Sequence, residues 1–297
     1  MNPLLLAFTA RAADTLPSAA QVAMGRTGIA SDAENTALSL NPGMLGLTER
    51  YDVEGMFRYG PDGGIGWGGS VVDARTSDRI AGGLFYSGES YSPPLTLNDS
   101  PAWTIPGEEI PNHRRFHDFG LGLGFPLADR AVSLGVGALL GYYDHDRFGD
   151  GWRFDAVAGF GWNPLDALTL GVVGRGFVPT EQDIPPSTGV GVRFHPDKFV
   201  AEADASWFPD VTEGLPITAA AGLEQGFGAG RIRAGWQYDA LTTVHAVSAG
   251  LGVTGNGGFL EYAAWIPVTG EVGLEATQHV ISVRIAAPED LDEDDPL

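Results

Sequence analysis

Most of the chain alternates between large apolar side chains and small or polar ones with a period of two, the pattern of β-strands with one apolar face. The pattern begins at Tyr51–Tyr59, where Asp52, Glu54, Met56 and Arg58 occupy every second position. It returns in Phe119–Phe125, Val132–Gly141, Trp152–Trp162, Val200–Trp207, Arg231–Asp239 and His279–Ile285. In several runs glycine fills the positions between the apolar residues. Residues 50–287 are therefore predicted to be all-β.

This alternation suits two architectures. In a soluble sandwich the apolar face packs on a second sheet, whereas in a membrane barrel it faces lipid and the other face lines the lumen. Aromatic residues gather near the predicted strand ends, as two membrane interfaces require: Tyr51, Tyr59, Tyr142, Tyr143, Trp152, Trp162, Trp207 and Phe208. Glycine on the second face suits close packing inside a barrel better than contact with bulk water. We therefore predict a transmembrane antiparallel β-barrel.

The connections between the runs tend to alternate between short and long, as in outer-membrane barrels. The short connections are 128–130, 163–167, 195–198, 228–230 and 255–258, and the long ones are 88–114, 144–151, 178–187 and 209–216. Two connections, 59–65 and 239–243, are short where the alternation predicts long ones. The pattern predicts about fourteen strands, an even number, as single-chain barrels have.

The ionisable residues of the predicted strands nearly all fall in the phase opposite to the large apolar residues. A charge that faces lipid at mid-membrane costs about 2–4 kcal/mol, so a barrel requires this segregation. The residues assigned to the lumen are Asp52, Glu54, Arg58, Asp118, Arg153, Asp155, Arg175, Arg193, Glu202, Asp204, Glu224, Arg233, Glu261 and Arg284. Both signs are present. These residues are predicted either to form Arg–carboxylate pairs that hold an internal segment or to line a polar conduit.

Residues 14–49 break the period of two and are predicted to form a compact hatch inside the lumen. The segment contains Gly25 and Gly28, a run of small residues and a turn at Asn41-Pro42-Gly43. Residues 36–40 can form a helical turn that Pro42 ends.

Three other segments have separate interpretations. Residues 1–13 resemble the remnant of a signal peptide, with a short apolar core but no preceding basic residue. The long, proline-rich connection at 88–114 carries Trp103 and Ile105, and it is either a lid over the outer mouth or a solvated loop. The acidic residues 288–297 are predicted to be disordered.

The composition excludes several classes of function. The 297 residues include no cysteine, which removes disulfides and thiolate metal sites. A net charge of −21 argues against a nucleic-acid partner. No apolar run approaches the roughly 18 residues of a spanning helix, and the mean hydropathy of −0.01 is typical of alternating strands.

No residue pattern indicates catalysis. The chain lacks a convincing nucleophile–base motif, and the glycines at 120–124 lie within a strand pattern rather than at a strand-to-helix junction. Asp144, Asp146 and Asp150 only faintly resemble a calcium loop, because their spacing does not fit an EF-hand. We predict that the protein is not an enzyme and needs no cofactor or metal.

The opening segment resembles one family. Its pattern of A-x-G-x-x-G-x-A, an aspartate and N-P-[AG]-x-[LM] before a run of strands is similar to that of FadL-type outer-membrane transporters of fatty acids and hydrocarbons and of their smaller PorV-like relatives. The matching residues are Ala23, Gly25, Gly28, Ala30, Asp32, Asn41, Pro42, Gly43 and Leu45. Gly43 stands where the family usually has alanine, and no terminal aromatic residue closes the chain.

The resemblance implies a barrel with an N-terminal hatch in the lumen and uptake of hydrophobic molecules, which leave through a gap in the wall. We therefore expect a Gram-negative outer-membrane barrel that passes small hydrophobic compounds, with the lipid bilayer and those compounds as its partners. The alternative is a non-transporting barrel that scaffolds a secretion or surface protein, as PorV-like relatives do.

Overall fold

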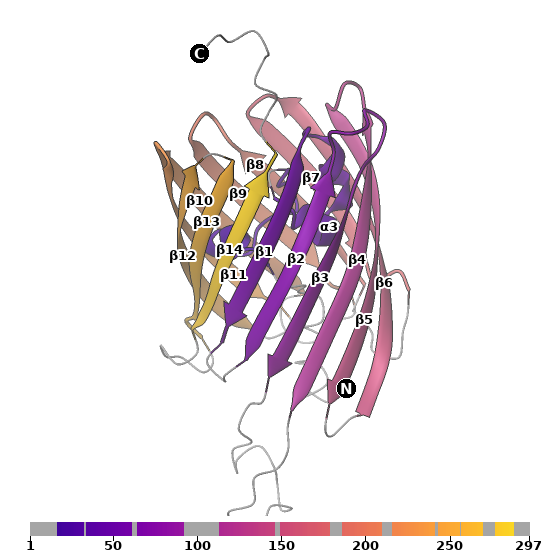
Figure 1. The fold of residues 1–297 in the computed structure, drawn as a ribbon, viewed down its shortest axis with the longest axis vertical. Coiled ribbons are helices and arrows are strands. Elements are labelled where there is room, and N and C mark those ends of the chain that lie inside the picture. Colours follow the sequence, from indigo (N-terminus) through magenta and orange to yellow (C-terminus); the bar gives the residue numbers. More distant parts are fainter. Residues whose placement is uncertain are drawn as a thin grey trace, which may run out of the picture.

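Fourteen antiparallel strands close into a single barrel, which confirms the predicted fold class (Figure 1). The computed structural model describes residues 17–32, 34–60, 64–91, 113–145, 149–178, 186–209, 216–240, 243–255, 257–269 and 277–287. The strands are β1 (Tyr51–Tyr59), β2 (Ile65–Asp73), β3 (Ala81–Tyr91), β4 (Arg114–Leu127), β5 (Val132–His145), β6 (Gly149–Leu165), β7 (Leu168–Arg175), β8 (Ser187–Phe194), β9 (Phe199–Trp207), β10 (Ile217–Phe227), β11 (Gly230–Asp239), β12 (Val244–Gly255), β13 (Gly258–Pro267) and β14 (Gln278–Ala286).

Every strand pairs with its neighbours in the sequence, and the barrel closes where β1 pairs with β14. That closing register joins Asp52 to Ala286 and Tyr59 to His279 without interruption. Closure removes the free sheet edges that would otherwise expose unpaired backbone groups, which a membrane does not tolerate.

The two rims of the barrel differ. At the short-turn rim, at the top of Figure 1, the β4–β5, β6–β7, β8–β9, β10–β11 and β12–β13 connections span no more than four residues each. The opposite end is called the long-loop rim here, and most of its connections are longer. Strands β4, β5 and β6 have 14, 14 and 17 residues, so the wall is tallest on their side.

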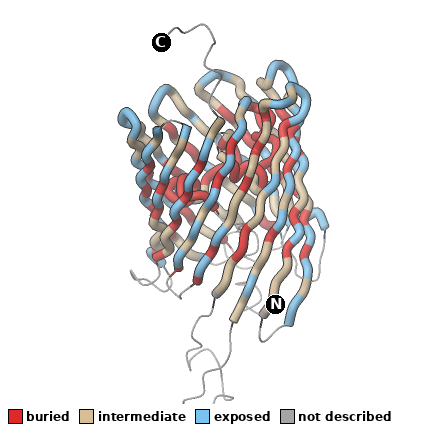
Figure 2. The backbone as a smooth tube through the Cα atoms, in the orientation of Figure 1, coloured by how far each residue is buried: buried red, intermediate tan, exposed pale blue. Residues whose placement is uncertain are grey.

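The wall separates large apolar side chains from small and charged ones. Leu121 and Val136 are 42% and 49% exposed on the outer face. The residues that alternate with them face inward. Gly135, next to Val136, is an example: a Cβ added to it would lie 2.2 Å from the backbone nitrogen of Gly43, which belongs to the chain inside the barrel. Figure 2 shows the resulting alternation of exposed and buried positions along the strands.

Two aromatic residues assigned to the membrane interfaces are not there. The ring of Tyr143 lies against Gly151, in the inner phase, and Phe208 is buried. Their neighbours Tyr142 and Trp207 take the outer phase instead, because successive side chains of a strand point to opposite faces.

The N-terminal segment, defined here as residues 17–49, contains three short helical elements, α2 (Ala19–Ala23), α3 (Ala37–Leu40) and η1 (Pro42–Gly46). The side chain of Ser18 caps α2 by accepting from the backbone N–H of Gln21, and Pro42 follows the end of α3, as expected from its missing N–H. The segment lies within the barrel, in its upper half in Figure 1. Its α2 contacts β11–β14, whereas α3 and η1 contact β3–β7.

Several predictions concern residues outside those that the structure describes: the signal-peptide remnant at 1–13, the candidate lid at Trp103 and Ile105, Asp146 of the calcium-like loop, and the tail at 288–297. Among the described residues, no helix combines the length and the apolar character needed to cross a membrane.

Candidate functional site

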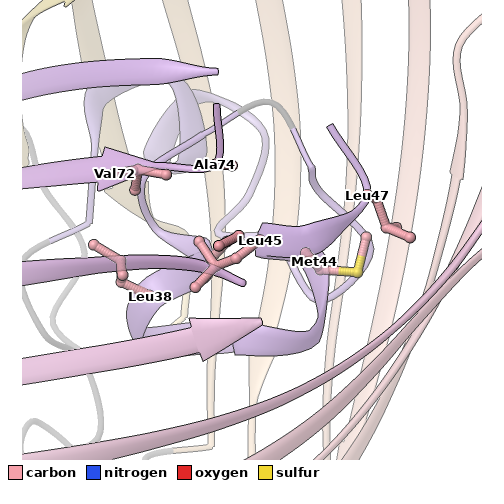
Figure 3. Close-up of a cluster of buried hydrophobic side chains, with 8 residues drawn as sticks. Leu38, Met44, Leu45, Leu47, Val72 and Ala74 are labelled. Atoms are coloured by element: carbon pink, nitrogen blue, oxygen red, sulfur yellow. The ribbon is translucent and has the colours of Figure 1, made fainter. Parts of the chain in front are cut away.

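The candidate site is the interface between the N-terminal segment and the inner wall. An apolar cluster anchors one end of the segment (Figure 3). Leu38, Met44 and Leu45 are fully or almost fully buried, and they pack with Val72 and Ala74 at the end of β2. Burying a leucine or methionine side chain contributes about 1.5–3 kcal/mol, so this cluster is a large part of the docking energy.

Backbone meets backbone at two glycines of the predicted hatch motif. A Cβ on Gly43 would lie 2.6 Å from the backbone nitrogen of Phe160, and one on Gly25 would lie 2.5 Å from the carbonyl oxygen of Trp236. Gly25 also has a φ of +74°, a conformation that glycine adopts without strain. The small residues therefore let the segment approach the wall more closely than any side chain would allow.

Asn41 links the two halves of the segment and joins them to the wall. It is fully buried, and its amide nitrogen donates to the carbonyl oxygens of Ile29 at 2.7 Å and of Phe160 at 3.2 Å. Its amide oxygen accepts from the backbone N–H of Gly43 at 3.1 Å. The asparagine thus satisfies three backbone groups, and Pro42 after it starts η1.

Two carboxylates of β9 hold the turn after α2. Thr27 donates its hydroxyl to Glu202 at 2.7 Å. The backbone N–H groups of Gly28 and Ile29 both donate to the same oxygen of Asp204, at 2.7 and 2.9 Å. These contacts, called the carboxylate clamp below, join the backbone and one hydroxyl of the segment to two side chains of the wall.

Two serines on β12 and β14, farther round the wall from β9, hold α2 and the residues next to it. Ser248 of β12 accepts from the N–H of Gly25 at 3.1 Å and donates to the carbonyl oxygen of Ala23 at 3.0 Å. Ser282 of β14 accepts from the N–H of Ala19 at 3.3 Å. Sequence reasoning missed both serines, although each occupies the inner phase of its strand.

Ion pairs surround the segment near the short-turn rim. Arg193 lies 3.0 Å from Glu202 and 3.9 Å from Asp32. Arg233 contacts both Glu224 and Glu261, the latter at 2.9 Å. Such pairing is what buried charges require, because an isolated buried charge is strongly destabilising.

The network continues through Arg50, which precedes β1. Arg50 lies 3.4 Å from Asp52, and it donates to the carbonyl oxygen of Glu34 at 2.8 Å. Burial lowers the pKa of Arg50. Glu54 is buried nearby, and one of its carboxylate oxygens has no hydrogen-bond partner among the described residues.

Glu34 brings a carboxylate of the segment itself into this network. Its carboxylate accepts from the hydroxyl of Ser18 at 3.1 Å. Burial raises the pKa of Glu34 above its usual value of 4.5, and Glu261 and Glu202 raise it further, whereas Arg233 and Arg284 lower it. The charged form of Glu34 is therefore unfavourable in the docked segment.

A second set of ionic contacts lies on the side of the lumen formed by β1 and β3–β7. One guanidinium nitrogen of Arg153 donates to both oxygens of Asp118, at 2.7 and 2.8 Å. Arg58 pairs with Glu89. Asp155 accepts from the N–H groups of Ala156 and Gly176, at 2.7 and 3.0 Å.

Two further arginines cap carbonyl groups of the segment. Arg175 donates to the carbonyl oxygen of Leu40 at 2.6 Å, at the end of α3. Arg130, in the β4–β5 turn, donates to the carbonyl oxygen of Gly46 in the segment at 3.3 Å and also to that of Ala74, just after β2, at 2.9 Å. The role of Arg130 was not foreseen, because a turn residue carries no alternation signal.

The structure thus brings the predicted hatch residues against the inner wall, where four of the predicted lumen residues contact the segment directly: Arg175, Arg193, Glu202 and Asp204. The chemistry offered is packing, hydrogen bonding and charge pairing. Among the described residues, no group of three His, Asp or Glu side chains is placed to hold a metal ion.

No protein-family model and no curated protein sequence matches the chain. Several solved structures, however, match its fold. The toluene transporter TodX of P. putida superimposes with a TM-score of 0.68 at 14% identity, over 92% of this chain and 98% of TodX. A FadL homologue of Pseudomonas aeruginosa gives 0.67 at 14% identity, with the same coverage. The toluene transporter TbuX of Ralstonia pickettii gives 0.64 at 13% identity, over 91% and 97%. The chain therefore has the fold of FadL-type hydrocarbon channels, as its opening segment suggested.

Proposed function

We propose that this chain is a β-barrel channel of the Gram-negative outer membrane that transports small hydrophobic compounds, and that its N-terminal segment obstructs the lumen until it moves. The observation that carries the proposal is the partition of the wall. Large apolar side chains are exposed all around the outer face, whereas charged side chains of the strands are buried on the inner face. A protein in water would gain nothing from this arrangement, but a bilayer requires it.

The orientation follows from the rims. Outer-membrane barrels have short turns on the periplasmic side and long loops outside. The short-turn rim is then periplasmic, and the N-terminal segment lies in the periplasmic half of the lumen. A compound that enters at the long-loop rim would therefore meet the N-terminal segment before it reaches the periplasmic side.

The substrate class is supported by the structural neighbours, two of which are toluene transporters. The hatch role of the segment is supported by its position and by the contacts described above. Its helical elements have only four or five residues each, so the segment can rearrange without unfolding a long helix.

A groove on the outer face suggests where an apolar compound would leave the lumen. The groove has a volume of about 560 Å³, and Ala203, Ala221, Gly222, Gly235 and other mostly apolar residues line it. Gly222 and Gly235 are paired across β10 and β11, and a Cβ on either would lie about 2.4 Å or less from backbone atoms of the N-terminal segment. Only backbone separates the segment from the groove here. We propose that lateral release uses this part of the wall and requires this pairing to open.

The many contacts that hold the segment favour a second candidate. A permanently docked segment would make the barrel a sealed scaffold for a secretion or surface protein. A sealed lumen together with co-purification of a partner would support this alternative.

Uptake by whole cells tests transport. A Gram-negative host that lacks its own FadL-type channels would express the chain, and the initial uptake rate of radiolabelled toluene would be measured. The expected result is a rate several-fold above that of cells with the empty vector. Equal rates, with the barrel shown to be folded in the outer membrane, would contradict the proposal. A variant that lacks residues 17–49 tests the hatch, because it should also admit a polar solute that the intact chain excludes.

A further inference from the structure

A small cavity lies between the start of α3 and the first three strands. Its lining includes Asn35 and Thr36 of the N-terminal segment, Met56 of β1, Ser70 of β2 and Phe85 of β3. The volume of the cavity is about 20 Å³. No contact described above depends on it.

Four buried polar atoms of the lining residues have no hydrogen-bond partner within the part of the chain that the structure describes. They are both amide atoms of Asn35, the Oγ1 of Thr36 and the Oγ of Ser70. These residues are only 2%, 6% and 8% exposed. Buried polar atoms are nearly always hydrogen-bonded to protein or to a bound molecule. Four unpartnered atoms around one cavity therefore indicate an occupant.

The size and the chemistry of the cavity define that occupant. A cavity of about 10–15 Å³ is enough for one water molecule, so this one accommodates a single oxygen-sized group. All of its lining residues are uncharged, which disfavours an ion. The side-chain N–H groups of Asn35 and the two hydroxyls can donate, whereas the side-chain amide oxygen of Asn35 can accept. The occupant must therefore be able to donate and to accept.

We propose that this cavity is a binding site for one neutral O–H group, supplied by a water molecule or by the end of a small alcohol or phenol. The group bridges Asn35 of the segment to Ser70 of the wall and so completes the docking of α3. The second source rests on the proposed transport function, because only a permeant compound would bring such a group into the lumen. Met56 and Phe85 would then contact the hydrocarbon attached to it.

A high-resolution crystal structure of the detergent-extracted chain tests the site directly, with and without a phenol soak. The expected result is one density peak within hydrogen-bonding distance of the Asn35 amide and the Ser70 hydroxyl. An isolated peak in both crystals identifies water, whereas continuous ring density after the soak identifies the hydroxyl of phenol. Both outcomes support the site. No peak, or side chains rotated so that they bond to one another, would overturn it. This readout does not depend on transport, so it is separate from any failure of the proposed function.

A thermal unfolding measurement tests the same site, because an occupied cavity and a dry cavity predict opposite changes in Tm for one substitution. If a bound group bridges the four atoms, Asn35→Leu breaks the bridge and leaves the two hydroxyls unpartnered, so Tm falls by about 2–4 °C. If the cavity is dry, the same change removes two unpartnered atoms, and Tm rises. Asp78→Asn is the control and should leave Tm unchanged, because Asp78 is exposed in the β2–β3 connection and does not line the cavity. A rise in Tm for Asn35→Leu with an unchanged control would contradict the proposal.

Discussion

The carboxylate of Asp204, on β9, accepts the backbone N–H of Gly28 at 2.7 Å, across 176 residues of sequence. The same oxygen accepts the N–H of Ile29. A wall residue thus recognises the backbone of the N-terminal segment rather than one of its side chains. These two hydrogen bonds form only while the turn after α2 keeps its conformation. Their presence therefore indicates that the segment is docked against the wall.

Asp204→Asn should loosen this turn. The substitution keeps the shape of the side chain but replaces the carboxylate oxygen that accepts both N–H groups with a weaker amide acceptor, which weakens docking by on the order of 1–2 kcal/mol. Hydrogen exchange at Gly28 and Ile29 should then accelerate about 5–30-fold. Asp150→Asn, at an exposed position near the long-loop rim, is the control and should change nothing there. Unchanged exchange in Asp204→Asn would show that the clamp does not hold the segment.

Gly43→Ala should destabilise the docked segment by about 1–3 kcal/mol, because the added methyl group would overlap the backbone of β6 around Phe160. The same clash explains why glycine stands where FadL-type sequences usually have alanine. Limited proteolysis should cut the variant's N-terminal segment faster than that of the parent chain. Gly55→Ala is the matched control, since nothing lies within 4 Å of a Cβ at Gly55. Equal cleavage of all three proteins would refute the steric argument.

The Arg153–Asp118 pair should show strong coupling. Removing one partner leaves an uncompensated buried charge at a cost of about 3–5 kcal/mol, whereas replacing both with leucine is close to neutral. Arg153→Leu should therefore lower the unfolding free energy more than the Arg153→Leu/Asp118→Leu double variant does. Denaturant unfolding of all four members of this double-mutant cycle is the measurement. Additive losses would mean that the two residues are stabilised independently.

Docking of the segment should depend on pH through Glu34. Because burial raises the pKa of Glu34 in the docked state, the docked segment binds its proton more readily than the free segment does. Docking is therefore strongest at pH values below the usual pKa of 4.5, and it weakens as the pH rises from that value to the higher pKa of the docked state.

Glu34→Gln removes this titration. At pH 7.5 the variant should be more resistant to proteolysis of the N-terminal segment than the parent chain, and at pH 4 the two should be equal. The substitution spares the hydrogen bond from Arg50, which goes to the backbone oxygen of Glu34. Asp78→Asn, at an exposed position in the β2–β3 connection, serves as the control. A variant less resistant than the parent at pH 7.5 would contradict the expected sign.

The sequence predicted the barrel well because alternation is a local property. Each strand shows its two faces through neighbouring residues such as Leu121 and Gly122, without information from distant parts of the chain. The same reasoning failed for Tyr143 and Phe208, where two adjacent aromatic residues were both assigned to the outer face. It also could not place Arg130, because the three positive-φ residues of its turn, Ala128, Asp129 and Arg130, give no periodic signal.

By itself, the sequence determined the fourteen-stranded barrel, the phase that faces inward and the presence of a separate small-residue segment before the first strand, because each of these depends on residue types at short spacing. Only the tertiary structure decided which wall residues meet that segment. Asp204 and Gly28, or Asn35 and Ser70, are far apart in the chain, and their proximity follows from the closure of the barrel around the segment. Contacts of this kind depend on three-dimensional packing, which no pattern of neighbouring residues records.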